Sequence, residues 1–206
     1  MNTPIEIEFA VCLNVPKDHP KVFSFLQIRP IVENEQIADL NLNEVKKEDA
    51  IIFCNSALGN GIIDDVTDFV YVKPEAFNAM KSQEIVKEVE MVNDEFLKQE
   101  KNYILVGPGR WGSSEPTLGI PVKWAQISAA RVIVESGLEN YRIDPSQGTH
   151  FFQNLTSFRV AYFTINPFIN DGFYDLDYLQ QFEPFKEYNY VRSEERRVGK
   201  ECATGC

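Results

Sequence analysis

Residues 5–13 read IEIEFAVCL and residues 22–29 read VFSFLQIR, and a turn-rich connector with two prolines separates them. Two apolar runs around such a connector predict a β-hairpin. Because side chains in a strand alternate between two faces, the pattern predicts one apolar face and one polar face. The apolar face contains Ile5, Ile7, Phe9, Val11, Leu26 and Ile28, and the polar face contains Glu6, Glu8, Gln27 and Arg29.

The residue types on the polar face suit a site for a metal-bound nucleotide. Mg²⁺ prefers carboxylate oxygens, and a guanidinium forks onto phosphate oxygens. The alternative, from the pattern alone, is a solvent-facing strand side with a cross-strand Glu–Arg pair. Both interpretations stay open at this point.

Two motifs of the hairpin, EIEFA (residues 6–10) and FLQIRP (residues 25–30), resemble the closing hairpin of the ATP-grasp domain in pyruvate phosphate dikinases and phosphoenolpyruvate synthases. The resemblance implies that Glu6 and Glu8 are ligands of Mg²⁺ on ATP. It further implies that Gln27 and Glu8 contact the nucleotide and that Arg29 is a catalytic phosphate clamp. The lysine and arginine that hold phosphates in this family belong to another part of the domain, so ATP binding is expected through the full-length protein.

The composition limits the class of protein. The chain has 206 residues and a formal net charge of −11, which argues against nucleic-acid binding because an acidic chain gains nothing from phosphate counterion release. No apolar run approaches the roughly 18 residues that cross a bilayer, and the first residues do not resemble a signal peptide. Four cysteines are too few for a disulfide scaffold. We expect a cytoplasmic protein.

The rest of the chain mixes strand and helix patterns. Strands are expected at 50–54, 69–73, 103–106 and 160–165, and helices at 82–99, 121–135 and 149–157. This order predicts an α/β to α+β fold, in which the ATP-grasp hairpin is followed by a swivelling β/α domain. We expect residues 1–40 to be a remnant of the ATP-grasp domain and residues 41–190 to be the second domain, with the break between Ile31 and Asn41. A strand at residue 5 without a preceding partner predicts a fragment of a larger protein.

The last residues differ from the rest. From Arg192 the chain reads RSEERRVGKECATGC, which has no helical or strand period. We expect residues 191–206 to be disordered and without function. The run 192–202 also resembles a translated sequencing adapter, which would make it an artefact of assembly.

His150 is a candidate phosphoryl carrier. It follows Pro145 in SQGTHFFQNL, where Ser146 or Thr149 would cap a helix, and a helix N-terminus favours added negative charge. The segment Gly148-Thr149-His150 resembles, with compressed spacing, the phosphohistidine motif of the dikinase swivelling domain. The alternative is a capping or packing histidine. His19, in the hairpin connector, is expected to be exposed.

Residues 107–112 read GPGRWG, which fits the dinucleotide fingerprint G-x-G-x-x-G. Ser113, Ser114 and Pro116 break any helix that would follow, so the pyrophosphate would lack its helix N-terminus. We therefore expect an ordered loop held by Trp111. Arg110 and a nest of loop amides remain candidates for binding an anion.

Two functions stay open. The first is an ATP- and Mg²⁺-dependent phosphotransferase that moves phosphoryl groups between ATP, a histidine and pyruvate or phosphoenolpyruvate. Isolated from the rest of its protein, the fragment is expected to be inactive. The second is a non-catalytic relative that binds a nucleotide or a protein partner and regulates.

Overall fold

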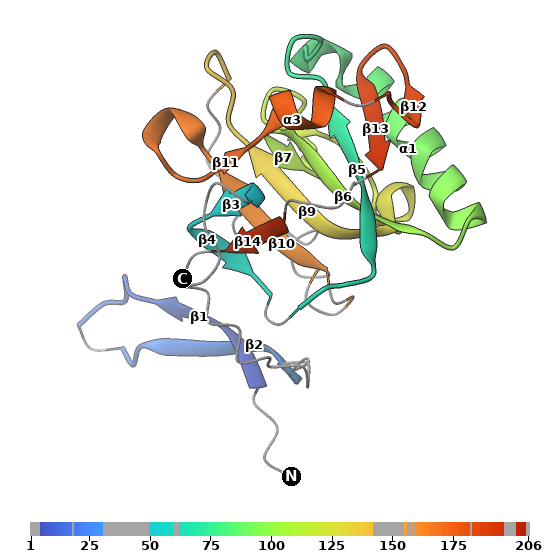
Figure 1. The fold of residues 1–206 in the computed structure, drawn as a ribbon. Helices are drawn as coiled ribbons and strands as arrows, with labels where there is room; N and C mark the ends of the chain where they lie inside the picture. Colours follow the sequence, from blue (N-terminus) through green and yellow to red (C-terminus); the bar gives the residue numbers. More distant parts are fainter. Residues whose placement is uncertain are drawn as a thin grey trace. The chain divides into compact units, whose positions relative to one another are not determined.

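The computed structural model describes residues 5–17, 19–30, 50–59, 62–141, 155, 158, 160–181, 183–195 and 201–204. The chain divides into two compact units, Met1–Glu33 and Asn34–Cys206 (Figure 1). The division falls inside the range in which the sequence predicts a domain break. The second unit, however, continues through the segment expected to be a disordered tail.

The first unit is an antiparallel hairpin of β1 (Ile5–Cys12) and β2 (Val22–Pro30), as predicted. Its register contains one irregularity. Glu8 stands opposite Gln27, but Phe9 stands opposite Phe25, so Leu26 has no partner across the ladder. This β-bulge places Phe23 and Phe25 on the same face as Phe9 and Val11, a placement that simple alternation from Leu26 and Ile28 does not give.

The second unit is built on a seven-stranded sheet with the order β12-β13-β5-β6-β9-β10-β4. Its four central strands run parallel to one another: β5 (Val66–Val72), β6 (Asn102–Pro108), β9 (Ala130–Ser136) and β10 (Ala161–Ile165). Each flanking strand pairs in antiparallel fashion with its inner neighbour: β4 (Ser56–Leu58) with β10, β13 (Val191–Glu195) with β5, and β12 (Lys186–Glu187) with β13. Central strands covered on both faces read as continuous apolar runs, which explains the pattern of these segments.

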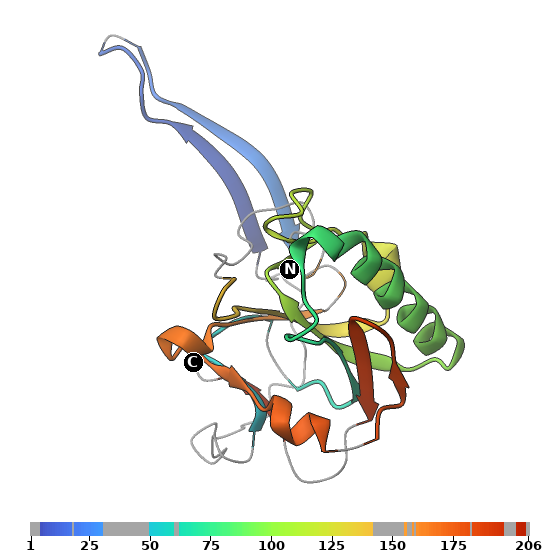
Figure 2. The ribbon, with the colours of Figure 1, turned by 90° about the horizontal axis from the view of Figure 1, so that it is seen from above.

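Each face of this sheet carries its own core. On one face, helix α1 (Ser82–Lys98) and the 3₁₀ helix η4 (Trp124–Ile127) pack around a cluster that includes Val89, Phe96 and Trp111. The opposite face carries a second cluster beneath β11 (Phe173–Tyr174), β3 (Ala50–Cys54) and α3 (Leu176–Gln180). Figure 2 shows α1 and α3 on opposite sides of the sheet.

Short elements complete the second unit: η3 (Ala79–Lys81), β7 (Arg110–Trp111), β8 (Gly119–Ile120), η5 (Pro167–Ile169) and β14 (Glu201–Thr204). β14 pairs with β3 in a three-stranded sheet of order β11-β3-β14. No helix among these described elements is long and apolar enough to cross a membrane.

Helix α1 confirms the helix predicted over 82–99. Five residues of its predicted apolar stripe are buried, namely Ile85, Val86, Val89, Val92 and Phe96, but the sixth, Leu97, is 48% exposed. The helix predicted over 121–135 is wrong. Residues 124–127 form η4, and Ala130–Ser136 form strand β9 in the centre of the sheet. The run of β-branched Val132, Ile133 and Val134 fills both cores from the two faces of this strand, which fits a buried parallel strand better than a helix.

The prediction of disorder over 191–206 is wrong for residues 191–195 and 201–204, which form β13 and β14. β13 pairs with β5, and Ser193 and Glu194 are buried there. A raised pKa at Glu194, caused by burial, accompanies this placement, and Arg192 donates a hydrogen bond to the Glu194 carboxylate. Backbone pairing with β5, together with the Arg192–Glu194 ion pair within β13, therefore holds this charged segment in the sheet although it lacks an apolar period.

Candidate functional site

The polar end of the hairpin brings the predicted nucleotide and metal residues to one place in the ladder. Glu6 stands directly opposite Arg29, and Glu8 stands directly opposite Gln27. Directly opposite residues have Cβ atoms about 5 Å apart, and diagonal neighbours are about 7–8 Å apart. The four positions therefore share one face within the reach of a single phosphate-bearing ligand. The side chains of Glu8 and Gln27 are exposed.

These residues fit a nucleotide-bound Mg²⁺ by the chemistry of their donors. Glu6 and Glu8 occupy positions two apart on one strand, which share a face, and glutamate is a residue type that supplies hard oxygen ligands. No group of three or more His, Cys, Asp or Glu residues gathers for a metal among the described residues. Mg²⁺ is commonly bound through one or two carboxylates together with substrate phosphates, so two acidic positions suit a nucleotide-bound ion.

The other end of the hairpin is aromatic. The rings of Phe9 and Phe23 stack with their centroids 5.1 Å apart. Phe9, Phe23 and Phe25 are nevertheless 53–59% exposed. Two strands alone do not bury these rings, and an isolated hairpin of this kind is at best marginally stable.

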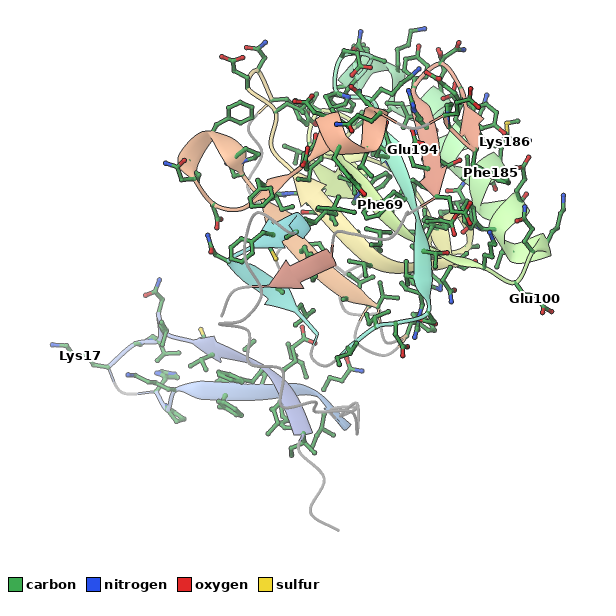
Figure 3. The ribbon with its side chains drawn as sticks, in the orientation of Figure 1. Lys17, Phe69, Glu100, Phe185, Lys186 and Glu194 are labelled. Atoms are coloured by element: carbon green, nitrogen blue, oxygen red, sulfur yellow. The ribbon has the colours of Figure 1, made fainter. Side chains whose placement is uncertain are left out.

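The connector of the hairpin lies at the end opposite the polar pairs. The backbone N–H of His19 donates to the carbonyl of Pro16 over 3.0 Å, and His19 is exposed, as predicted. Figure 3 shows Lys17 at the tip of this connector, pointing away from the strands. Neither residue approaches the polar pairs along the ladder, so both serve as distant controls.

The glycine-containing loop at 107–112 does not offer free amides. Each backbone N–H from residue 109 to 112 donates to another part of the protein: Gly109 to the Ser136 carbonyl (3.1 Å), Arg110 to the Leu118 carbonyl (2.9 Å), Trp111 to Glu135 Oε1 (3.0 Å) and Gly112 to the Ile120 carbonyl (2.8 Å). The hypothesis of a backbone nest for an anion at Arg110 is therefore wrong, because its donors are already used.

Packing explains the glycines of this loop. A Cβ on Gly107 would lie 2.3 Å from the ring of Trp111, and a Cβ on Gly119 would lie 1.9 Å from the Arg110 carbonyl oxygen. Gly109 has a φ of +72°, which favours glycine. Strand β7 then pairs with β8 instead of opening a helix. The match to a dinucleotide fingerprint thus reflects close packing around one tryptophan.

Trp111 fixes this loop, as predicted. It is 1% exposed, and its Nε1 donates to the Val134 carbonyl over 3.1 Å. Its backbone N–H donates to Glu135, a buried carboxylate whose second oxygen accepts a 2.5 Å hydrogen bond from the Tyr162 hydroxyl. Glu135 thereby joins β7, β9 and β10.

Sequence reasoning missed Glu135, because it falls in the segment predicted as a helix. A single acid inside the apolar run RVIVES is the only local signal for it. Because protein groups donate to both of its oxygens, we interpret Glu135 as a structural tie.

The order of the parallel strands gives no second candidate site. In open α/β sheets, ligands bind beyond the carboxyl ends of strands, where the strand order reverses. Here β5, β6, β9 and β10 follow one another across the sheet in chain order, so these four strands contain no reversal. The hairpin is thus the better candidate for ligand binding.

His150, Ser146 and Thr149 lie outside the described residues. Within the helix predicted over 149–157, the structure describes Leu155 alone, and it describes Phe158 just after that segment. Leu155 is buried in the core that contains α1. The proposed phosphoryl-carrier role of His150 stays a hypothesis from sequence.

Compared with protein-family models, curated proteins and solved structures, the chain matches none.

Proposed function

We propose that the chain is part of an ATP-dependent phosphotransferase similar to phosphoenolpyruvate synthases and pyruvate phosphate dikinases, and that its hairpin contacts Mg·ATP. The observation that carries the proposal is the register of β1 and β2, in which Glu6 pairs with Arg29 and Glu8 with Gln27. The positions of two acidic residues, whose type suits a metal, and of an arginine, whose type suits phosphate oxygens, then share one face of the ladder.

Each residue has its own role in this proposal. Glu6 and Glu8 hold Mg²⁺, Gln27 contacts the nucleotide or the metal, and Arg29 binds phosphate oxygens. Bound Mg²⁺ neutralises phosphate charge. Because catalysis of phosphoryl transfer is mainly positioning and charge stabilisation, Arg29 contributes by holding the phosphates in place.

The wider reaction rests on the sequence resemblance. In it, a phosphoryl group moves from ATP through a histidine, for which His150 is the candidate, and the partner substrate is pyruvate or phosphoenolpyruvate. We place the protein in the cytoplasm, a reducing compartment in which the free thiols of Cys12 and Cys54 are expected to persist.

A non-catalytic, regulatory relative is the second candidate. The observation that favours it is the closed glycine loop of the second unit, whose amides are all engaged within the protein. Incubation with labelled Mg·ATP separates the two functions. The enzyme should gain an acid-labile, base-stable label that His150→Ala removes and His19→Ala retains, whereas the regulatory relative should bind ATP without any label.

The hairpin proposal is tested by calorimetry on the protein expressed from its complete open reading frame. A lost hydrogen bond to a charged group costs about 1.5–3 kcal/mol, so Arg29→Ala and Glu8→Gln should each weaken Mg·ATP binding roughly ten- to a hundredfold. Lys17→Ala, at the connector, is the matched control and should leave the affinity unchanged. Wild-type affinity in both site variants would contradict the proposal.

A further inference from the structure

Leu26 interrupts an alternation that is otherwise complete. The pairs Glu6–Arg29, Ile7–Ile28 and Glu8–Gln27 follow one register, and the pairs from Phe9–Phe25 to Cys12–Val22 follow another, shifted by one residue. Without Leu26, β2 would read VFSFQIRP, in which Phe23, Phe25 and Ile28 share one face and Ser24, Gln27 and Arg29 share the other.

The extra residue has no evident purpose in folding. Removing it would leave each of the eight cross-strand pairs intact in one continuous ladder, and a bulge interrupts the ladder and leaves one residue unpaired. The side chain of Leu26 is 58% exposed, so it is not retained for burial.

The place of the bulge indicates what it does. It lies next to the Glu8–Gln27 pair, where the polar end of the hairpin meets the aromatic end that starts with Phe9 and Phe25. A bulge bends its strand and increases the local twist, which re-aims neighbouring side chains. The bulge therefore sets the direction of the polar pairs relative to the aromatic pairs.

We propose that the bulge at Leu26 is a positioning element of the nucleotide site, which aims Glu8, Gln27 and Arg29 at the ligand. This inference rests on the proposed function of the hairpin. It assigns the effect to the presence of an extra residue and not to the leucine side chain. Variants that change the residue count therefore differ from variants that change only the side chain.

The test compares deletion of Leu26, Leu26→Ala and Glu8→Gln in the protein expressed from its complete open reading frame. Deletion should preserve the melting temperature and the cross-strand nuclear Overhauser contacts of the hairpin. Misplacement of positioning groups by about 1 Å can cost up to a hundredfold, so deletion should weaken Mg·ATP binding about tenfold or more. Leu26→Ala keeps the residue count and should bind Mg·ATP within about twofold of wild type.

A second change in residue count supports the comparison. One alanine inserted after Leu26 enlarges the bulge and should also weaken Mg·ATP binding. Wild-type affinity after both deletion and insertion, with weakened binding in Glu8→Gln, would overturn the positioning role and leave the proposed function intact. Wild-type affinity in both Glu8→Gln and Arg29→Ala would overturn the proposed function and the positioning role together. Loss of the hairpin on deletion would show that the bulge serves folding and would also overturn the positioning role.

Discussion

The hairpin and the sheet unit differ in how much of their own apolar surface they bury. Every large apolar side chain that the structure describes within strands β1 and β2 is at least 41% exposed. In the sheet unit, two separate clusters fill both faces of seven strands, and Trp111, Phe69 and Tyr103 are almost fully buried. The polar pairs that suit a nucleotide thus lie in the unit that buries less of its own apolar surface.

The difference shows that a sequence motif in a well-packed region can reflect packing and not ligand binding. The glycine loop resembles a ligand-binding fingerprint, but it belongs to the best-packed part of the molecule, and packing accounts for Gly107 and Gly119. The hairpin offers only alternating polar residues, which sequence alone does not distinguish from a solvated strand. The cross-strand register of the hairpin, and not the presence of a sequence motif, makes the hairpin a better candidate for ligand binding than the glycine loop.

The largest expected effect comes from removing a buried ring from the sheet unit, and removal of an exposed ring from the hairpin is its comparison. Trp111→Ala should lower the free energy of unfolding by about 3–5 kcal/mol, because it empties a buried site. Phe23→Ala should cost about 1 kcal/mol, close to the value of an exposed aromatic pair. Chemical denaturation measures both. Equal losses would contradict the contrast between the two regions.

Deletion of Arg192–Cys206 tests the edge of the sheet unit. Because β13 pairs with β5 and buries Ser193 and Glu194, the truncated chain should lose about 1–3 kcal/mol of stability. A thermal melt of both chains measures the change. An unchanged melting temperature would support the sequence interpretation that residues from 192 onward bury no face.

The smallest expected effect concerns Asp68, which is 2% exposed on β5. Burial raises the pKa of Asp68 above its usual value, although the Thr67 hydroxyl and Lys101 oppose this shift. The folded chain therefore disfavours the ionised carboxylate, and this penalty is absent below the unfolded pKa and complete above the folded pKa. Asparagine does not ionise and keeps an acceptor for Thr67.

The stability of Asp68→Asn relative to wild type should accordingly rise with pH across that window and then stay constant. Denaturant titrations between pH 3 and 8 check this, with the exposed Asp94→Asn as a control. A relative stability that falls with rising pH would contradict the assigned cause.

Local patterns predicted the elements whose signals are local. The alternation around residues 14–21 gave the hairpin, and the stripe from Ile85 to Phe96 gave α1. The bulge also has a local sequence signal. Phe25 and Leu26 are two consecutive apolar residues, and they interrupt the alternation of apolar and polar residues along β2. The polar pairs followed from the same alternation.

The failures share a physical cause, which is dependence on distant partners. Residues 130–136 contain helix-compatible alanine and arginine, but burial between two cores makes them strand β9. The charged residues 192–195 join the sheet through β5. Glu135 is satisfied by Trp111 and Tyr162, residues 24 and 27 positions away along the chain. No single window of sequence contains these partners.

The central claim is that Mg·ATP binds at the polar end of the hairpin and not at the glycine loop. Hydrogen–deuterium exchange of the protein expressed from its complete open reading frame, with and without Mg·ATP, tests it most directly. Binding at the hairpin predicts slower exchange on nucleotide addition in β1 and β2, centred on Glu6–Glu8 and Gln27–Arg29, with unchanged exchange at residues 107–112. Protection at residues 107–112 without protection of the hairpin would contradict it.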